Sequence, residues 1–380
     1  MKQEVADIIA RAQEGKAPSY EEVMELLALD EASPEATAVR GAANDLVRAK
    51  TGNAAVLLGQ IGVDMYPCEA DCQFCSFGKS HTCFTDHVTM PIDEVVERAR
   101  DFTKGGDLYA LYLMTMHSFD RQYFLDCVKA VRAAVPASTR LVCNIGDADK
   151  EYFEQLKAAD LNAIYHVKRL GEGELTKISP ERREATIRAA FEAGLSIQDC
   201  CEPIGAETPN EDIATRLFEI QARGHEMGLH DCAGVMKRNS VPGTRYEGLA
   251  NEITDMRLAL IGAIETFVMV DQDDFPWMAV HEPNTVSLMS GANTIWAETG
   301  FNPRDTAEDT SAGRGLDVPM VRQMFYVEAR GRGVGRPSGL PPEGSFQRCA
   351  ARWCRIHQHL STTRGNRFPI LYQGKEDARR

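Results

Sequence analysis

Three cysteines near the end of the first predicted strand have a spacing that suits an iron–sulfur cluster. The segment MYPCEADCQFCSFGKSHT places Cys68, Cys72 and Cys75 in the pattern C-x3-C-x2-C, with Phe74 directly before the last cysteine. Three thiolates on one short loop can each bind one iron of a four-iron cluster, which leaves the fourth iron without a protein ligand. An open metal position is what activation of a small molecule requires, whereas structural sites are normally closed. The pattern therefore predicts a reactive [4Fe-4S] cluster.

A structural zinc site is the alternative interpretation of the same cysteines. Zinc is usually held by four Cys or His side chains that come in pairs from two short turns. His81 or Cys83 could provide a fourth ligand, but the sequence shows no second pair of ligands with that spacing. A zinc-binding structural or regulatory protein is therefore the competing hypothesis from another functional class.

Eleven cysteines are a high count for a chain without signs of secretion. The N-terminal segment MKQEVADIIARAQEG lacks the apolar core of a signal peptide and predicts a short amphipathic helix instead. No stretch approaches the roughly 20 apolar residues that a membrane span needs. We therefore expect a cytoplasmic protein that does not enter the membrane. In that reducing compartment, thiols serve metal ligation or catalysis more often than disulfides.

The composition limits the kinds of partner. The chain has 380 residues and a formal net charge of −14, with 43% hydrophobic residues. Nucleic-acid binding is driven by clustered Lys and Arg, so this acidic chain is not expected to bind nucleic acid. The length fits one large α/β barrel with extensions, and the apolar content allows a large core.

Apolar strands and amphipathic helices alternate along most of the chain. Predicted strands cover 55–63, 108–114, 139–145, 162–167, 196–204, 229–236, 265–270 and 293–298. Predicted helices cover 91–103, 119–134, 149–159, 181–193, 211–227 and 248–262. Repeated βα units predict a parallel (β/α)8 TIM-type barrel, and a doubly wound sheet is the alternative. In a barrel, ligands gather at the carboxyl ends of the strands, so the distant cysteines should approach one mouth.

The chain divides into three predicted parts. Residues 1–52 form a helical extension, in which Ser19 and Glu22 have the spacing of a capping box and a second helix covers 35–50. Residues 53–326 form the barrel. Residues 327–380 contain ten arginines and only four acidic residues, with repeated Gly and Pro. We expect this segment to be a poorly ordered tail without catalytic residues.

The cysteine loop resembles the signature of the radical S-adenosylmethionine superfamily in its spacing, its aromatic residue and its place after the first strand. This resemblance implies that the amino and carboxylate groups of S-adenosylmethionine bind the open iron. One electron, from a donor such as flavodoxin or ferredoxin, then splits the sulfonium bond into methionine and a 5′-deoxyadenosyl radical. The cofactor carries that chemistry, and the protein orients it and excludes water.

The segment from Gln60 to Phe325 resembles the biotin-synthase-like branch, which includes biotin synthase, hydrogenase maturase, thiamine tyrosine lyase and methylornithine synthase. The resemblance rests on 141–174, 200–208, 238–244 and 289–309. It implies cofactor contacts at the adenine, the ribose, the amino acid and the methionyl carboxylate. Arg183 is assigned to the carboxylate because a guanidinium fork suits that group. The full set of implied cofactor contacts is Phe74, His166, Arg169, Glu172, Glu174, Arg183, Ile204 and Gly205.

The resemblance also raises the question of a second iron–sulfur cluster. Biotin synthase holds a sacrificial cluster inside the barrel on three cysteines and an arginine. Cys143 matches one of these cysteines, and Cys200 or Cys201 lies near another. The stretch 110–118 lacks the remaining cysteine, and His281 is the polar residue nearest to the place of the arginine.

A complete sulfur store is therefore not expected. We predict a biotin-synthase-like enzyme that abstracts hydrogen from another small molecule, followed by rearrangement, fragmentation or modification. Cys143, Cys200 and Cys201 are its candidate catalytic residues, possible ligands of a second cluster, or packing residues. Sulfur insertion of the biotin-synthase type with a rearranged second cluster is the alternative within the same chemistry.

Overall fold

The fold is described from a computed structural model, which covers residues 1–229, 232–247, 253–281, 284–301, 316–325 and 333–334. These residues belong to one compact unit, Met1–Arg336. The predicted tail, 327–380, lies outside the described residues except for β12 (Gly333–Val334), whose backbone pairs with the first barrel strand. Among the described helices, none is long and apolar enough to cross a membrane.

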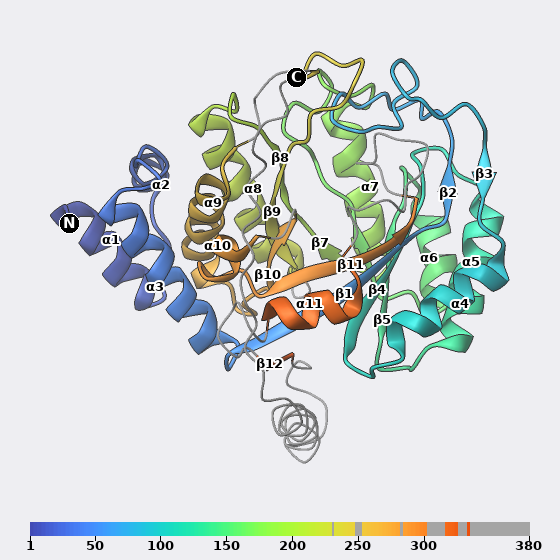
Figure 1. Cartoon of the computed structure of the whole chain (residues 1–380), viewed down its shortest axis with the longest axis horizontal. Helices are drawn as coiled ribbons and strands as arrows, with labels where there is room; N and C mark the ends of the chain where they lie inside the picture. Colours follow the sequence, from blue (N-terminus) through green and yellow to red (C-terminus); the bar gives the residue numbers. More distant parts are fainter. Residues whose placement is uncertain (230–231, 248–252, 282–283, 302–315, 326–332, 335–380) are drawn as a thin grey trace, which may run out of the picture. The chain divides into compact units, whose positions relative to one another are not determined.

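Parallel strands form one curled sheet, whose two ends are β7 and β8 (Figure 1). Their bounds are β1 (Ala54–Gly62), β4 (Leu108–Met114), β5 (Arg140–Asn144), β6 (Ala163–Tyr165), β7 (Ser196–Gln198), β8 (Cys201–Ile204), β9 (Ala233–Lys237), β10 (Met278–His281) and β11 (Thr294–Gly300). Neighbouring strands pair in parallel in the order β7–β6–β5–β4–β1–β11–β10–β9–β8. Outside this sheet, β2 (Asp64–Met65) pairs antiparallel with β3 (Val88–Thr89).

The curled sheet closes into a ring at an interrupted strand. β7 pairs with β6, β8 pairs with β9, and only Asp199 and Cys200 separate β7 from β8. The two segments therefore fill one strand position, which gives eight positions in all. This confirms the predicted (β/α)8 TIM-type barrel. The alternative, a doubly wound sheet, is wrong. The two edges of such a sheet lie far apart, whereas here the two end strands, β7 and β8, are consecutive and only two residues apart.

Helices cover the outside of the barrel and follow the strands in chain order (Figure 1). They are α4 (Ile92–Thr103), α5 (Arg121–Ala134), α6 (Lys150–Ala158), α7 (Pro180–Glu192), α8 (Asn210–Met227), α9 (Asp255–Val268), η1 (Met269–Asp271), α10 (Thr285–Leu288) and α11 (Val318–Gln323). Side chains of Asp120, Asp149 and Ser179 accept hydrogen bonds from the first turns of α5, α6 and α7. Such caps satisfy backbone N–H groups that have no partner within the helix.

Three helices precede the barrel: α1 (Gln3–Gln13), α2 (Tyr20–Leu27) and α3 (Pro34–Lys50). The predicted capping box is confirmed, because the Glu22 N–H donates to Ser19 Oγ at 3.3 Å and the Ser19 N–H donates to Glu22 Oε2 at 2.9 Å. α3 packs along α9, and α2 packs on α8. The extension therefore covers the outer side of two barrel helices and leaves the strand ends clear of it (Figure 1).

One predicted strand is wrong. Residues 265–270 were expected to form the seventh strand, but they lie in α9 and η1. Thr254 caps α9, and the helix is buried almost all round because it is covered by α3 as well as by the barrel. Its apolar residues therefore show no helical stripe, and a short apolar run of this kind cannot be told from a buried strand by pattern alone. The seventh strand is β10, in the segment MAVH. Residues 248–252 of the predicted helix 248–262 lie outside the described residues.

The barrel strands have two buried faces. Inward-facing side chains such as Val56, Tyr112 and Trp296 form a small cluster inside the ring. Outward-facing neighbours such as Leu57 and Leu111 belong to the large core shared with the helices. This alternation follows from the two-residue period of a strand, and it decides which residues can reach the interior of the barrel.

Candidate active site

The three cysteines of the C-x3-C-x2-C pattern lie on a loop that β2 and β3 join at its base. The Cys68 N–H donates to Phe77 O at 2.7 Å, and Cys68 O accepts from the Lys79 N–H at 3.0 Å. The Cys75 N–H donates to Cys72 O at 3.1 Å. These bonds fold the loop back on itself, so one compact turn carries all three sulfurs.

A second loop, after β6, fixes the position of the cysteine loop. Asp71 takes the left-handed backbone conformation, with φ of 52°. Its carboxylate accepts from the Ser80 N–H at 2.8 Å and pairs with Lys177 at 2.7 Å. Burial opposes ionisation of Asp71, but the bonds from Lys177 and Ser80 prevail and lower its pKa to about 2. Main-chain bonds of 2.8 and 2.9 Å, from Lys177 to Ala70 and from Gln73 to Leu175, complete the attachment.

The cysteine sulfurs lie in an apolar environment beside positive charge. Burial raises the pKa of Cys72 to about 12, and the nearby charges of Arg169 and Arg183 oppose that rise. Burial also raises the pKa of Cys68 and Cys75. The metal-free thiols are therefore protonated at neutral pH, and metal binding must release protons.

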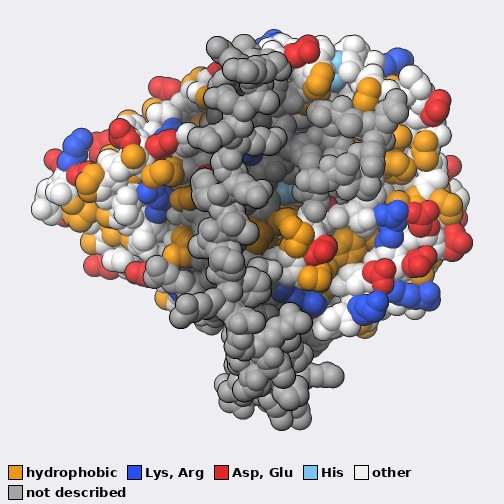
Figure 2. All heavy atoms as spheres, viewed as in Figure 1, with side chains coloured by type: hydrophobic (Ala, Val, Ile, Leu, Met, Phe, Trp, Pro, Cys, Tyr) orange, Lys and Arg blue, Asp and Glu red, His pale blue; other side chains and the backbone are white. Residues whose placement is uncertain are grey.

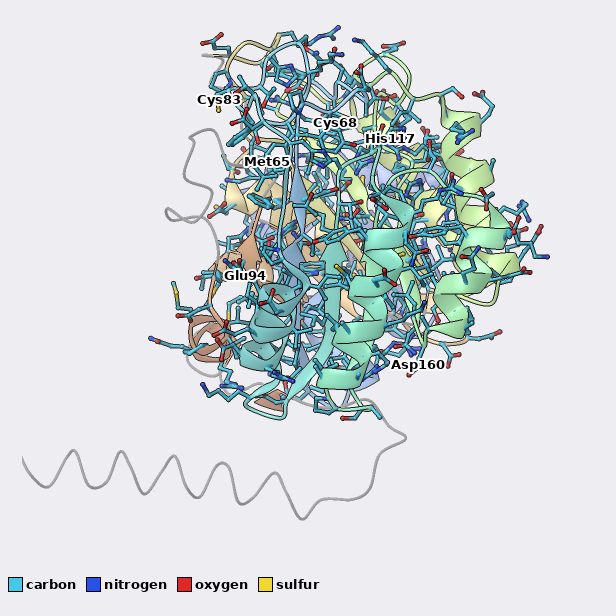
Figure 3. All side chains as sticks on the ribbon, turned by 90° about the vertical axis from the view of Figure 1, so that its right-hand side faces the viewer. Met65, Cys68, Cys83, Glu94, His117 and Asp160 are labelled. Carbon is cyan, nitrogen blue, oxygen red and sulfur yellow. The ribbon has the colours of Figure 1, made fainter. Side chains whose placement is uncertain are left out.

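A cavity of about 170 Å³ extends from the cysteine loop into the barrel. Cys68, Cys72 and Cys75 line it together with residues at the carboxyl ends of the strands. Figure 3 shows Cys68, Met65 and His117 at this end of the molecule, whereas Asp160, which precedes β6, lies at the opposite end. The site therefore has the location that ligands take in this architecture.

One wall of the cavity carries a buried carboxylate with two partners. Glu202, on β8, is 1% exposed and accepts from the Tyr165 hydroxyl at 2.6 Å. Arg169 pairs with the other Glu202 oxygen at 3.2 Å. The Arg169 guanidinium also lies 5.8 Å from the centre of the Phe74 ring, within cation–π range. Phe74 and Arg169, both predicted from the sequence, thus meet on the cavity wall.

A second network surrounds Arg183, which is 4% exposed. Its guanidinium pairs with Glu172 at 3.2 Å and with Asp147 at 3.5 Å. His166 Nε2 lies 3.0 Å from the same Asp147 carboxylate. Burial lowers the pKa of His166 to about 4, so the ring is neutral at physiological pH. Burial would raise the pKa of Asp147, but its bond with His166 and the nearby charges hold it well below its usual value.

The predicted cofactor contacts in and around the loop after β6 fall into two groups, those that line the cavity and those that do not. Arg183 and His166, both predicted to contact the cofactor, line the cavity. Glu172 is buried behind them, accepts from Thr176 at 2.6 Å, and is absent from the cavity wall among the described residues. Glu174 is exposed and also does not line the cavity. Neither glutamate therefore reaches the described wall of the cavity, where a direct contact with the cofactor would be made.

Ile204 and Gly205 also lie away from the described wall of the cavity. The Ile204 side chain points outward into the core shared with the helices. A side chain at Gly205 would collide with Glu207 and Arg238, since a Cβ there would lie 2.2 and 2.5 Å from their atoms. A contact with adenine could involve only the backbone of these two residues.

The predicted catalytic cysteines divide between the two faces of the strands. Cys200 lines the cavity, whereas Cys143 and Cys201 are fully buried in the outer core and are not part of the described wall. The expected convergence at one mouth is therefore wrong for Cys143 and Cys201. Asn144, the neighbour of Cys143, faces the cavity instead.

Several cavity residues were missed by sequence reasoning. They are Tyr112, His117, Tyr165, Glu202 and Cys232. His117 Nδ1 is buried and has no hydrogen-bond partner in the described part of the chain. Glu202 could have been suspected, because a charged residue inside an apolar strand is rarely buried without a partner. Cys232 precedes β9 and carries no motif that separates it from a packing cysteine.

The donor set fits a cluster with one open position. No group of three or more Cys, His, Asp or Glu side chains in the described regions is arranged around a single metal ion. A cubane does not need that arrangement, because each thiolate binds a different iron. His81 Nε2 contacts Cys75 O at 2.8 Å and Cys83 is exposed, so the contacts of neither residue indicate a fourth ligand. The three thiols, the orphaned His117 nitrogen and the cavity beside them fit an iron–sulfur cluster with a small-molecule ligand.

Searches of protein-family models and of curated proteins find no match to the chain. Among solved structures, the hydrogenase maturase HydG from Carboxydothermus hydrogenoformans superposes with a TM-score of 0.66 at 16% identity, over 85% of this chain and 78% of HydG. Methylornithine synthase (PylB) superposes with a TM-score of 0.67 at 17% identity, over 83% of this chain and 95% of PylB. Both belong to the enzyme types that the sequence resemblance names. The chain therefore shares the barrel fold of these two structures.

Proposed function

We propose that this chain is a radical S-adenosylmethionine enzyme that acts on a small molecule. The observation that carries the proposal is the set of three loop thiols facing a cavity at the carboxyl end of the barrel. Cys68, Cys72 and Cys75 would hold a [4Fe-4S] cluster, and S-adenosylmethionine would bind its open iron. The fold shared with HydG and PylB supports this assignment. When bound, the cluster and cofactor supply a 5′-deoxyadenosyl radical.

The residues around the cysteine loop suit a zwitterionic ligand. Arg169 and Arg183 provide positive charge on the cavity wall, and a guanidinium can bind a carboxylate through two hydrogen bonds. Both guanidiniums already pair with buried carboxylates, which hold them in fixed orientations. Phe74, beside Arg169, offers an apolar surface for an aromatic base.

The neutral His166 would act as a hydrogen-bonding group rather than as a charge. Its Nε2 lies 3.0 Å from the Asp147 carboxylate and 3.3 Å from an Arg183 nitrogen, so its ring orientation is fixed. A neutral imidazole beside two guanidiniums adds no further positive charge to the wall. It therefore orients a ligand without competing for the carboxylate that the arginines would hold.

The deeper part of the cavity would receive the substrate. It is lined by Gln60, Tyr112, Asn144, His281 and Trp296, a mixture of apolar surface and a few polar groups. Such a lining suits a small metabolite, since its few polar groups fix orientation while apolar walls exclude water. On the described, coloured part of the visible face, acidic and basic side chains are interspersed (Figure 2), so that part offers no basic patch for a polyanion. The electron would come from a one-electron donor such as flavodoxin or ferredoxin.

Sulfur insertion with a rearranged second cluster is the weaker candidate. Cys143 and Cys201, two of the three candidate cysteines for such a cluster, point away from the cavity. A second cluster inside the barrel would need several thiolates on the inner face. We therefore favour hydrogen abstraction followed by rearrangement, fragmentation or modification.

The proposal is tested by anaerobic reconstitution with iron and sulfide. The expected product is brown, carries about four irons per chain, and forms 5′-deoxyadenosine from S-adenosylmethionine when dithionite is added. A count near eight would favour a second cluster. A folded protein that takes up zinc but no iron–sulfur cluster would overturn the proposal.

A further inference from the structure

Two cysteines outside the loop face the same cavity from neighbouring strands. Cys200 lies in the interruption between β7 and β8, and Cys232 directly precedes β9. They are 5% and 1% exposed. The Asp199 N–H donates to Cys232 O at 3.2 Å, so the residue directly before Cys200 is bonded to the backbone of Cys232. β8 and β9 lie side by side in the barrel (Figure 1).

A buried ionic network fixes the backbone at Cys200. Asp199 points outward and accepts from Arg216 and, at 2.7 Å, from Arg223. The Cys200 N–H donates to Asp199 Oδ1 at 2.9 Å, and Arg216 donates to Cys200 O at 3.3 Å. With Asp199 held outside, strand alternation directs the next side chain, Cys200, into the barrel.

The surroundings keep Cys200 as a thiol. Burial raises its pKa well above the usual value, and the negative charge of Glu202 adds to the effect. At Cys72 the charges of Arg169 and Arg183 favour a thiolate, whereas at Cys200 the charges of Glu202 and Glu265 oppose one, so Cys200 is the poorer metal ligand. The described residues also offer no group of three or more ligands for a single ion here. A thiol that stays protonated inside a reaction cavity has one other use in radical chemistry, since its S–H bond is weaker than most C–H bonds.

Resting on the proposed function, we propose that Cys200, with Cys232 behind it, donates a hydrogen atom to a carbon radical formed in this cavity. The S–H bond of Cys200 breaks, a C–H bond forms, and a thiyl radical is left. The thiyl radical joins the Cys232 thiol in a two-sulfur radical anion, and one proton is released. One electron from the low-potential donor and two protons then restore both thiols. The net reaction consumes one electron and one proton for each carbon radical quenched.

This assignment narrows the reaction class. A product radical that ends by taking a hydrogen atom belongs to a rearrangement or a fragmentation. Sulfur insertion ends instead with a new C–S bond. The hydrogen acquired by the product would come from solvent, because thiol protons exchange with water.

The thiol pair is tested first without any turnover. Phenylarsine oxide bridges two adjacent thiols with loss of one water. The cluster-loaded protein should take up one arsenical, seen by mass spectrometry, and the Cys200→Ala and Cys232→Ala variants should not. Cys201→Ala is the matched control, since its side chain neighbours Cys200 but faces the outer core. Uptake that survives Cys200→Ala, or no uptake by the parent protein, would overturn the pairing.

Hydrogen donation is tested with dithionite in D2O, without substrate and without added thiols. The radical from S-adenosylmethionine should then take deuterium from Cys200, so that 5′-deoxyadenosine carries one deuterium. Cys200→Ala should lower this labelled fraction several-fold, whereas Cys201→Ala should not change it. If unlabelled 5′-deoxyadenosine forms in the parent protein, the donor assignment fails and the proposed function stands. If no 5′-deoxyadenosine forms, the proposed function and the donor role fail together.

Discussion

The inner and outer faces of the barrel strands use the same residue types for different purposes. Cys200 and Cys201 are consecutive, yet one lines the cavity and the other packs against the helices. Glu202 faces inward with Tyr165 and Arg169 as partners, whereas Glu265, on α9 in the outer layer, is fully buried without a hydrogen bond in the described regions. The comparison teaches that the face, rather than the residue type, separates a position on the cavity wall from a packing one.

The largest expected effect comes from a pair of cysteine variants on the two faces. Cys72→Ala removes one iron ligand and should reduce 5′-deoxyadenosine formation to background, with a clear loss of bound iron. Cys143→Ala changes only the outer core and should keep the iron content and the activity, at a cost of roughly 1 kcal/mol in stability. Iron analysis and chromatography of the nucleoside check both. Activity retained in Cys72→Ala would refute the cluster assignment.

Removing the Arg183 guanidinium, which pairs with the buried Glu172 and Asp147, should destabilise the fold. Arg183→Met leaves Glu172 and Asp147 without a buried cation, which should cost on the order of 3–5 kcal/mol in denaturant unfolding. The neighbouring Arg182 also pairs with Asp147, but its side chain is 64% exposed. Arg182→Met should therefore cost less than about 1 kcal/mol. Equal effects in the two variants would contradict the importance of burial.

Glu265 should make stability fall as pH rises. Burial raises its pKa from 4.5 to about 8. The folded state therefore binds more protons than the unfolded state between these values, and folding stability decreases as pH increases through that window. Glu265→Gln removes the titration and should exceed the parent protein in stability by on the order of 2–4 kcal/mol at about pH 8, with little difference near pH 5. Unfolding curves at several pH values measure this, and a pH-independent difference would contradict the raised pKa.

The smallest effect is expected far from both faces. Ser19→Ala removes the capping box of α2 and should cost about 1 kcal/mol in stability. Formation of 5′-deoxyadenosine should not change, because α2 packs on α8 rather than on the cavity. A loss of activity would show that the helical extension influences the site.

The sequence allows prediction of the cysteine loop and of most strands and helices, and four of the predicted cofactor contacts, Phe74, His166, Arg169 and Arg183, line the cavity. These features depend on local spacing and on residues that follow strand ends. The face of each cysteine could not be predicted, because parallel strands are buried on both sides and lack a polar alternation. The strand predicted at 265–270 failed because most of α9 is buried, so its apolar residues show no helical stripe. Tyr112 and Cys232 line the cavity because the sheet curls and turns one face of its strands inward, which no local sequence pattern reports.

The short ribbon of β2 and β3 has a consequence for metal loading. It holds the two ends of the cysteine loop together, and Lys177 and Leu175 anchor the middle of the loop to the barrel side. The cysteine loop is thus closed by contacts within the protein, which do not require iron. Unlike small zinc domains, which unfold when the ion is removed, this protein should keep its architecture after demetallation. Repeated cycles of chelation and refilling should therefore be reversible.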